Sequence, residues 1–116
     1  MDKPWVGYDL DGTLAEHSDK PMPFIGPPVP AMVEHLLQTV ASGKEVRIFT
    51  ARASTPDFNT YALHRRIIDA WCTLNLGRTF EITCVKDIHM EALYDDRAFH
   101  VVPNTGRIIR PDDTSV

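Results

Sequence analysis

Cysteine is scarce in this chain: only Cys72 and Cys84 occur among its 116 residues. They form no Cys-X-X-Cys pair, and none of the five histidines lies at metal-ligand spacing from another. A structural zinc site takes four such ligands, in closely spaced pairs. The sequence therefore predicts neither a zinc centre nor a disulfide framework, and free thiols fit a reducing, cytoplasmic setting.

Long apolar runs and an excess of positive charge are also missing. The first residues, MDKPWVGYDLDG, contain no apolar stretch as long as that of a secretory signal, and no window approaches a membrane span. The net charge is -4, which disfavours nucleic acid as a bulk partner but leaves a local basic patch open. We expect a cytoplasmic protein without a membrane partner, and the sequence leaves oligomerisation open.

The composition is that of a globular domain. Apolar residues make up 43% of the chain and charged residues 24%, which excludes a disordered or collagen-like chain. A chain this short has little room for two folded units, so we expect residues 1–116 to form one domain without a cap. Strand-like and helix-like segments alternate, which is typical of a three-layer, Rossmann-like α/β fold with a mainly parallel sheet.

Local patterns predict where the elements lie. Five of the nine prolines fall within residues 16–30 and exclude regular structure there, leaving a stiff loop that either covers a site or merely connects. A stripe of apolar residues in the second helix (Leu63, Ile67, Trp71 and Leu74) is expected to face the core. The predicted strands are 5–10, 45–50, 80–85 and 92–95, the helices run from Pro30 to Gly43 and from an N-cap at Thr55 to Gly77, and a hairpin joins 100–102 to 107–109.

Polar side chains follow each of the four predicted strands. Because parallel strands of an open α/β sheet place their carboxyl ends at one edge, we expect these groups to converge on one crevice. Oxygen ligands there suit Mg²⁺, which is usually bound together with phosphate. The groups are Asp9 and Asp11, Thr50 and Arg52, Lys86, and Asp95 and Asp96.

The strings DLDGTL, FTAR, VKD and YDDRA occur in this order and resemble the motifs of the haloacid dehalogenase-like (HAD) superfamily of phosphatases. The resemblance covers nearly the whole chain. In that superfamily the first strand ends in DxDGT, the second ends in Thr or Ser, a lysine follows, and a late strand carries an acidic pair. The smallest members, phage-type hydrolases and the 3'-phosphatase domains of polynucleotide kinases, are the most similar.

The resemblance implies that Asp9 is the nucleophile and forms an aspartyl-phosphate. Asp11 would be the general acid for the leaving alcohol and then the base for the attacking water. Two residues at i and i+2 share a side while the chain is extended, so both carboxylates can point at one phosphate. Gly12 would permit the sharp backbone turn that follows, and Thr13 would fasten it through its hydroxyl.

The resemblance also implies the phosphate and metal ligands. The substrate phosphate would be bound by Thr50, through its hydroxyl and backbone amide, and at Ala51 and Arg52. Lys86 would neutralise Asp9 and a phosphate oxygen together. Mg²⁺ would be held by Asp9, the backbone carbonyl of Asp11, and one or both of Asp95 and Asp96. Two nearby residues are expected to have other roles: His17 to be idle, and Arg97 to pair with a neighbouring acid.

These observations favour a Mg²⁺-dependent phosphomonoester hydrolase whose phosphorylated substrate is a small molecule or a bulky ester such as a nucleic-acid end. An Asp-X-Asp-Gly string alone is often a turn or part of a calcium loop, but the glutamate that an EF-hand needs at the twelfth position is missing. A carbon–halogen hydrolase would need neither Asp11 nor the late acidic pair. A non-catalytic module that binds phosphate or metal on the same fold remains the alternative.

Overall fold

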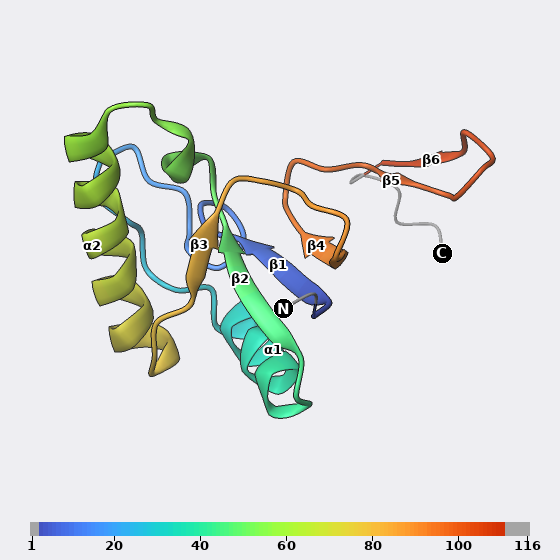
Figure 1. Cartoon of the computed structure of the whole chain (residues 1–116), viewed down its shortest axis with the longest axis horizontal. Coiled ribbons are helices and arrows are strands. Elements are labelled where there is room, and N and C mark those ends of the chain that lie inside the picture. Colours follow the sequence, from blue (N-terminus) through green and yellow to red (C-terminus); the bar gives the residue numbers. More distant parts are fainter. Residues whose placement is uncertain (1–2, 111–116) are drawn as a thin grey trace.

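The computed structural model describes residues 3–110, which form an α/β fold with a parallel sheet (Figure 1). Four strands pair in the order β3-β2-β1-β4, and all three pairings are parallel. None of the helices in this part of the chain is long and apolar enough to cross a membrane. The elements are β1 (Trp5–Asp9), α1 (Pro30–Ala41), β2 (Glu45–Phe49), the 3-10 helix η1 (Ala51–Ser54), α2 (Phe58–Leu76), β3 (Glu81–Thr83), β4 (Met90–Tyr94), β5 (His100–Val101) and β6 (Ile108–Ile109).

Both long helices pack on one face of the sheet. Val6 and Tyr8 of β1 point to that face and join a single apolar core with Leu36 of α1 and Ile68 of α2. The chain moves from β1 to β2 and from β2 to β3 in the same direction across the sheet. Because such crossover connections are right-handed, their helices, α1 and α2, lie on the same face. Successive residues of a strand alternate between faces, so Trp5 points to the opposite face.

The opposite face is covered by the β3–β4 connection, residues 84–89, which contains no helix (Figure 1). The indole of Trp5 is fully buried there: its Nε1 donates to Asp87 Oδ1 at 2.8 Å, and the Arg47 guanidinium lies 4.5 Å from the ring centre. The expectation of three layers was therefore wrong for the described residues. Six residues between β3 and β4 are too few for a helix and its two connections.

The helix boundaries follow local capping signals, with one difference from the prediction. α1 begins at Pro30, and Gly43, just beyond its end, has a φ of 91° that a side chain would disfavour. α2 is capped by Asp57 rather than Thr55: the carboxylate accepts from the Thr60 backbone N–H at 2.8 Å, whereas the Thr55 hydroxyl accepts from the Asp57 N–H. Both residues are good caps, but only Asp57 is in reach of the first helical turn.

The buried face of α2 is rotated from the expected stripe. Leu63 is 38% exposed and Leu74 is 83% exposed, so the expectation that they face the core was wrong. Trp71 belongs to both the expected and the observed stripe, and Ile67 of the expected stripe also packs against the core, as predicted. Apolar spacing alone therefore could not distinguish the two stripes. The core-facing residues are Ile68, Trp71, Cys72 and Leu76.

The proline-rich segment between β1 and α1 is irregular, as predicted, but it is fastened to the core. The Trp71 indole donates to the Gly26 carbonyl at 2.9 Å, and the Val29 N–H donates to the Leu14 carbonyl at 2.7 Å. Gly26 has no room for a side chain, because a Cβ there would meet the Glu16 carbonyl. The segment therefore holds a defined course beside α2.

The predicted hairpin is present as the antiparallel pair β5–β6, which extends away from the parallel sheet (Figure 1). Its turn includes Asn104 and Gly106, both with positive φ. These are the residue types that adopt the left-handed conformation most readily.

Candidate active site

Three carboxylates from the two ends of the sequence meet where β1 and β4 end. Asp9 is the last residue of β1, and Asp95 and Asp96 directly follow β4, its parallel neighbour. One carboxylate oxygen from each of the three lies within 4.8 Å of the others. The structure thus brings together three of the four acidic residues that the sequence singled out as metal ligands.

Thr13 and Gly12 hold this cluster in place. The Thr13 hydroxyl accepts from the Asp96 N–H at 3.2 Å and lies within donating distance of Asp96 Oδ1 at 3.2 Å and Asp9 Oδ2 at 3.4 Å. Thr13 therefore fastens not only its own turn but also the residues after β4. Gly12 has a φ of 92°, and a Cβ there would collide with Asp96 and His17. A glycine is thus required at this position for both backbone and space.

The closeness of the three carboxylates changes the proton affinity of Asp9 and Asp96. Burial raises the pKa of Asp9 to about 7, helped by its hydrogen bond to Asp96 and by the negative charges of Asp95 and Asp96. Partial burial also raises the pKa of Asp96, but its hydrogen bonds with Asp9, His17 and Thr13 outweigh burial, so the pKa of Asp96 is lowered overall. The raised pKa of Asp9 favours a proton on this carboxyl group, and a cation bound in the cluster would displace that proton.

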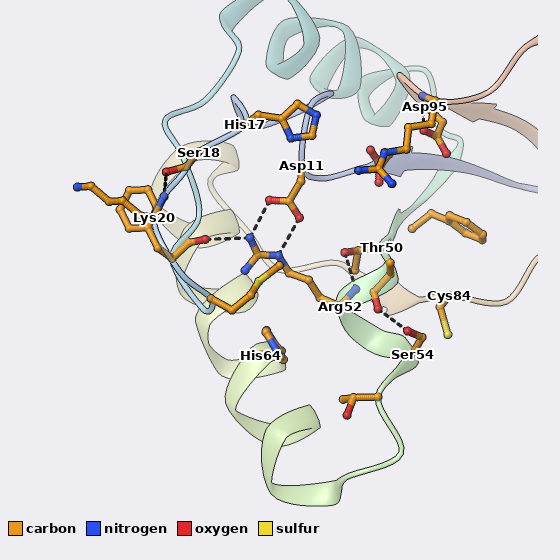
Figure 2. Close-up of a pocket in the computed structure, with 17 residues that line it drawn as sticks. Asp11, His17, Ser18, Lys20, Thr50, Arg52, Ser54, His64, Cys84 and Asp95 are labelled. Atoms are coloured by element: carbon orange, nitrogen blue, oxygen red, sulfur yellow. Dashed lines mark hydrogen bonds and ion pairs between the residues drawn. The ribbon is translucent and has the colours of Figure 1, made fainter.

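Asp11 points away from this cluster and is paired with Arg52 (Figure 2). The guanidinium grips both carboxylate oxygens, with Nη2 2.7 Å from Oδ1 and Nε 2.8 Å from Oδ2. Arg52 also donates to the backbone carbonyls of Pro23 and Phe24, and its side chain is only 5% exposed. The structure therefore gives Arg52 internal partners where the resemblance implied a substrate phosphate.

Thr50 directly follows β2, Ala51 begins η1, and both line the same cavity as Asp9 and Asp11. The Thr50 N–H donates to the Thr83 carbonyl at 2.9 Å, and its hydroxyl accepts from the Arg52 N–H at 3.1 Å. The backbone amide that was expected to hold a phosphoryl oxygen thus belongs to the sheet, whereas the hydroxyl proton remains to be donated.

These residues line a cavity of about 680 Å³ (Figure 2), a size that suits a small organic ligand. The acidic wall includes Asp9, Asp11 and Asp95, and the other walls come from the proline-rich segment, η1 and α2. The sequence did not single out the contributors His17, Lys20, Met22, Phe24, His64, Cys84 and Arg97 as site residues.

Two cationic side chains, Arg97 and Lys86, are not placed as the sequence led us to expect. Arg97 lines the cavity, and its backbone N–H donates to Asp95 Oδ1 at 2.9 Å. Lys86 is exposed and is not among the cavity-lining residues, although Cys84 of the same loop is. The catalytic and phosphate-binding roles that the resemblance implied for Lys86 stay predictions.

His17 takes part in the site instead of lying idle. Its Nε2 is 3.2 Å from Asp96 Oδ2, and the imidazole lies beside Asp11 at the upper wall of the cavity (Figure 2). The only signal in the sequence was its position shortly after the DLDGT string. The partner of His17 comes from the far end of the chain, so local pattern reasoning could not identify it.

The donor set fits a hard divalent cation. All three grouped side chains offer oxygen, as Mg²⁺ and Ca²⁺ require, and no thiol or imidazole belongs to the group. Asp9 and Asp95 face the cavity, whereas Asp96 is engaged by Thr13 and His17. The arrangement can hold a cation on one side and a small anion beside it.

Comparison with known proteins supports the fold. No known family model matches the chain, and no curated protein matches its sequence. A solved structure of a conserved protein from Bacteroides thetaiotaomicron is similar, with a TM-score of 0.57 and 20% sequence identity, over 83% of this chain and 78% of that chain. At this identity the likeness bears on the fold alone and agrees with an α/β arrangement.

Proposed function

We propose that the protein is a Mg²⁺-dependent phosphomonoester hydrolase of the HAD type that acts through an aspartyl-phosphate. The observation that carries the proposal is the meeting of Asp9, Asp95 and Asp96 within 4.8 Å. Repulsion among three carboxylates is relieved by a divalent cation, and Mg²⁺ characteristically binds carboxylates and phosphate together. The likeness of the DLDGTL, FTAR and YDDRA strings to HAD motifs supports the same assignment, together with a HAD-like form of the fold.

In the first step, an Asp9 carboxylate oxygen attacks phosphorus and the bond from phosphorus to the ester oxygen breaks. The leaving oxygen takes a proton from Asp11, which yields the free alcohol and phosphorylated Asp9. In the second step a water attacks the same phosphorus, gives its proton to Asp11, and releases inorganic phosphate from Asp9. Both residues return to their starting states.

The other residues supply binding and charge. A bound Mg²⁺ would be held by Asp9, the Asp11 carbonyl and one or both of Asp95 and Asp96, and would neutralise phosphate oxygens next to the carboxylates. The Thr50 hydroxyl donates to one phosphoryl oxygen. Because Arg52 is engaged, Arg97 is the cavity-lining guanidinium that can bind the phosphate.

The substrate is a phosphate monoester whose leaving group occupies the remainder of the cavity. No helix or strand longer than an isolated bridge lies in residues 10–29, so this part of the described chain contributes a loop and no cap domain. An open cavity of this kind accepts esters larger than itself, because part of the substrate can remain outside.

Hydrolysis of a generic aryl phosphate tests the proposal. Wild type should release phosphate with Mg²⁺ and not with EDTA, and Asp9→Asn should lose at least about 1,000-fold in kcat. Asp69→Asn makes the same change on α2, outside the cavity, and should retain full activity. Acid quenching should trap phosphate on Asp9. Equal activity of Asp9→Asn and wild type, or activity without divalent ion, would contradict the mechanism.

A non-catalytic module that binds phosphate or metal is the second candidate, and one observation favours it. Both oxygens of Asp11 are held by Arg52, and a carboxylate in that state is an acceptor rather than an acid. A wild type that binds Mg²⁺ and inorganic phosphate but hydrolyses no phosphate ester would favour this candidate.

A further inference from the structure

Arg52 links the side chain of Asp11 to the proline-rich segment at Pro23 and Phe24. Its guanidinium makes four hydrogen bonds: two to the Asp11 carboxylate, one to the Pro23 carbonyl at 3.0 Å and one to the Phe24 carbonyl at 2.8 Å. A guanidinium has five N–H donors in a rigid plane, so this arrangement uses nearly all of them. The carboxylate and the two carbonyls are thereby fixed relative to one another.

The backbone of Arg52 is anchored to the parallel sheet through Thr50. The Arg52 N–H donates to the Thr50 hydroxyl, and the Thr50 N–H donates to the Thr83 carbonyl at the end of β3. The guanidinium is thus attached to a rigid part of the fold. A buried cation without partners is costly, so the side chain keeps its position only while its acceptors remain in place.

The segment that Arg52 holds forms a wall of the cavity. Lys20, Met22 and Phe24 all line it, and the Lys20 ammonium lies 4.6 Å from the centre of the Phe24 ring. Met22 is 63% exposed and Phe24 is 40% exposed, so core packing does not hold these side chains. The fastening to the core begins directly after Phe24, where Ile25 is buried in the apolar core and the Trp71 indole donates to the Gly26 carbonyl.

We propose that Arg52 is a positioning residue that holds residues 20–24 as the substrate-facing wall and, with the same guanidinium, aims Asp11 into the cavity. The catalytic half of this inference rests on the proposed function. The structural half, that the wall and Asp11 depend on each other, does not. A change at Asp11 therefore loosens a segment that Asp11 itself does not bond.

Cleavage by chymotrypsin after Phe24, followed by mass spectrometry, measures the position of the wall without any activity. Arg52→Gln should be cleaved there at least about tenfold faster than wild type, since opening of the loop limits cleavage. Arg52→Lys should fall between the two, because an ammonium cannot grip a carboxylate and two carbonyls in one plane. Arg66→Gln removes an exposed arginine of α2 and should behave as wild type.

Asp11→Asn tests whether the position of residues 20–24 depends on the bond between Arg52 and Asp11. The side-chain amide of this variant would place an N–H group against the Arg52 guanidinium, where a carboxylate oxygen accepts in wild type. Because Arg52 would then hold residues 20–24 less firmly, cleavage after Phe24 should accelerate at least about threefold. Asp9→Asn removes a carboxylate from the same cavity without touching Arg52 and should leave cleavage unchanged. Protection of Phe24 in Asp11→Asn equal to that in wild type would overturn the inference, even if Arg52→Gln fails to fold.

Kinetics with the aryl phosphate test the catalytic half. Arg52→Gln should both raise KM and lower kcat, whereas a residue that only holds the wall would change KM alone. An unchanged kcat would overturn the assignment of Arg52 to Asp11. If wild type hydrolyses no phosphate ester while both cleavage results hold, the proposed function fails and the structural coupling stands.

Discussion

The cavity has two acidic sides that differ in how their charge is balanced. On one side the partly exposed Asp11 is matched by Arg52, whose side chain is buried. On the other side Asp9, Asp95 and Asp96 face one another, and burial raises the pKa of Asp9 to about 7. The charge of the first side is balanced within the fold. On the second, the unbalanced side, we propose that a cation binds. Charge that the chain does not balance itself indicates where a cation belongs.

The largest expected difference between the two acidic sides is the effect of their substitutions on Mg²⁺ affinity. Asp95→Asn removes a carboxylate from the unbalanced side and should weaken Mg²⁺ binding at least about tenfold by calorimetric titration. Asp11→Asn keeps the backbone carbonyl that is proposed as a ligand and should change the affinity by less than about threefold. Equal losses in the two variants would break the distinction between the sides.

The source of positive charge for the substrate phosphate is the next test. Arg97→Gln should raise KM for an aryl phosphate about tenfold, because Arg97 lines the cavity and Arg52 is engaged elsewhere. Lys86→Gln should have a smaller effect, since an exposed ammonium is screened by solvent. The opposite order would return the role to Lys86, as the resemblance implies.

Stability in the absence of metal should depend on pH through Asp9. Its pKa is raised in the folded protein to about 7, so the contribution to stability is fully present below the unfolded value near 4 and is lost as the pH rises through 7. In EDTA, the Tm of wild type should fall more between pH 5 and pH 8 than that of Asp9→Asn. Added Mg²⁺ should restore the wild-type Tm at pH 8. A parallel fall in both proteins would assign the pH dependence to other groups.

Thiol labelling should give the smallest effect and probes access to the cavity. Burial raises the pKa of Cys72 to about 12, so it carries almost no thiolate at neutral pH, whereas Cys84 lines the cavity. Iodoacetamide should modify Cys84 alone, with Cys84→Ser unlabelled. Inorganic phosphate with Mg²⁺ should slow labelling about twofold if they occupy the unbalanced side. Labelling of Cys72 in the folded protein would contradict its placement in the core.

The side of the site formed by Asp9, Asp95 and Asp96 could be predicted from sequence because each residue ends or follows a strand. Asp9 and Asp95 follow apolar runs, and parallel pairing of β1 and β4 places the two ends together. The Arg52 link could not be predicted in the same way. Its partners Pro23 and Phe24 lie in a loop without periodicity, and their acceptors are backbone carbonyls, which carry no sequence signature.

The two wrong predictions about the fold, the buried stripe of α2 and the number of layers, have related physical causes. The choice between two stripes of α2 depends on how the helix is rotated against the sheet, and Trp71 fits both. The number of layers depends on the sequence between β3 and β4, where residues 84–89 cross back without a helix. Strand order determines that crossing, and strand order is a property of the assembled sheet rather than of any single segment.

Gly12 gives the site an unusual relationship to mutation. At most positions a protein tolerates small changes one at a time, and function declines gradually. At position 12 even a methyl group would push against Asp96 and His17 together, so the ion-binding side and its histidine would be disturbed in the same event. A single substitution at Gly12 would therefore disturb both parts of the proposed site together.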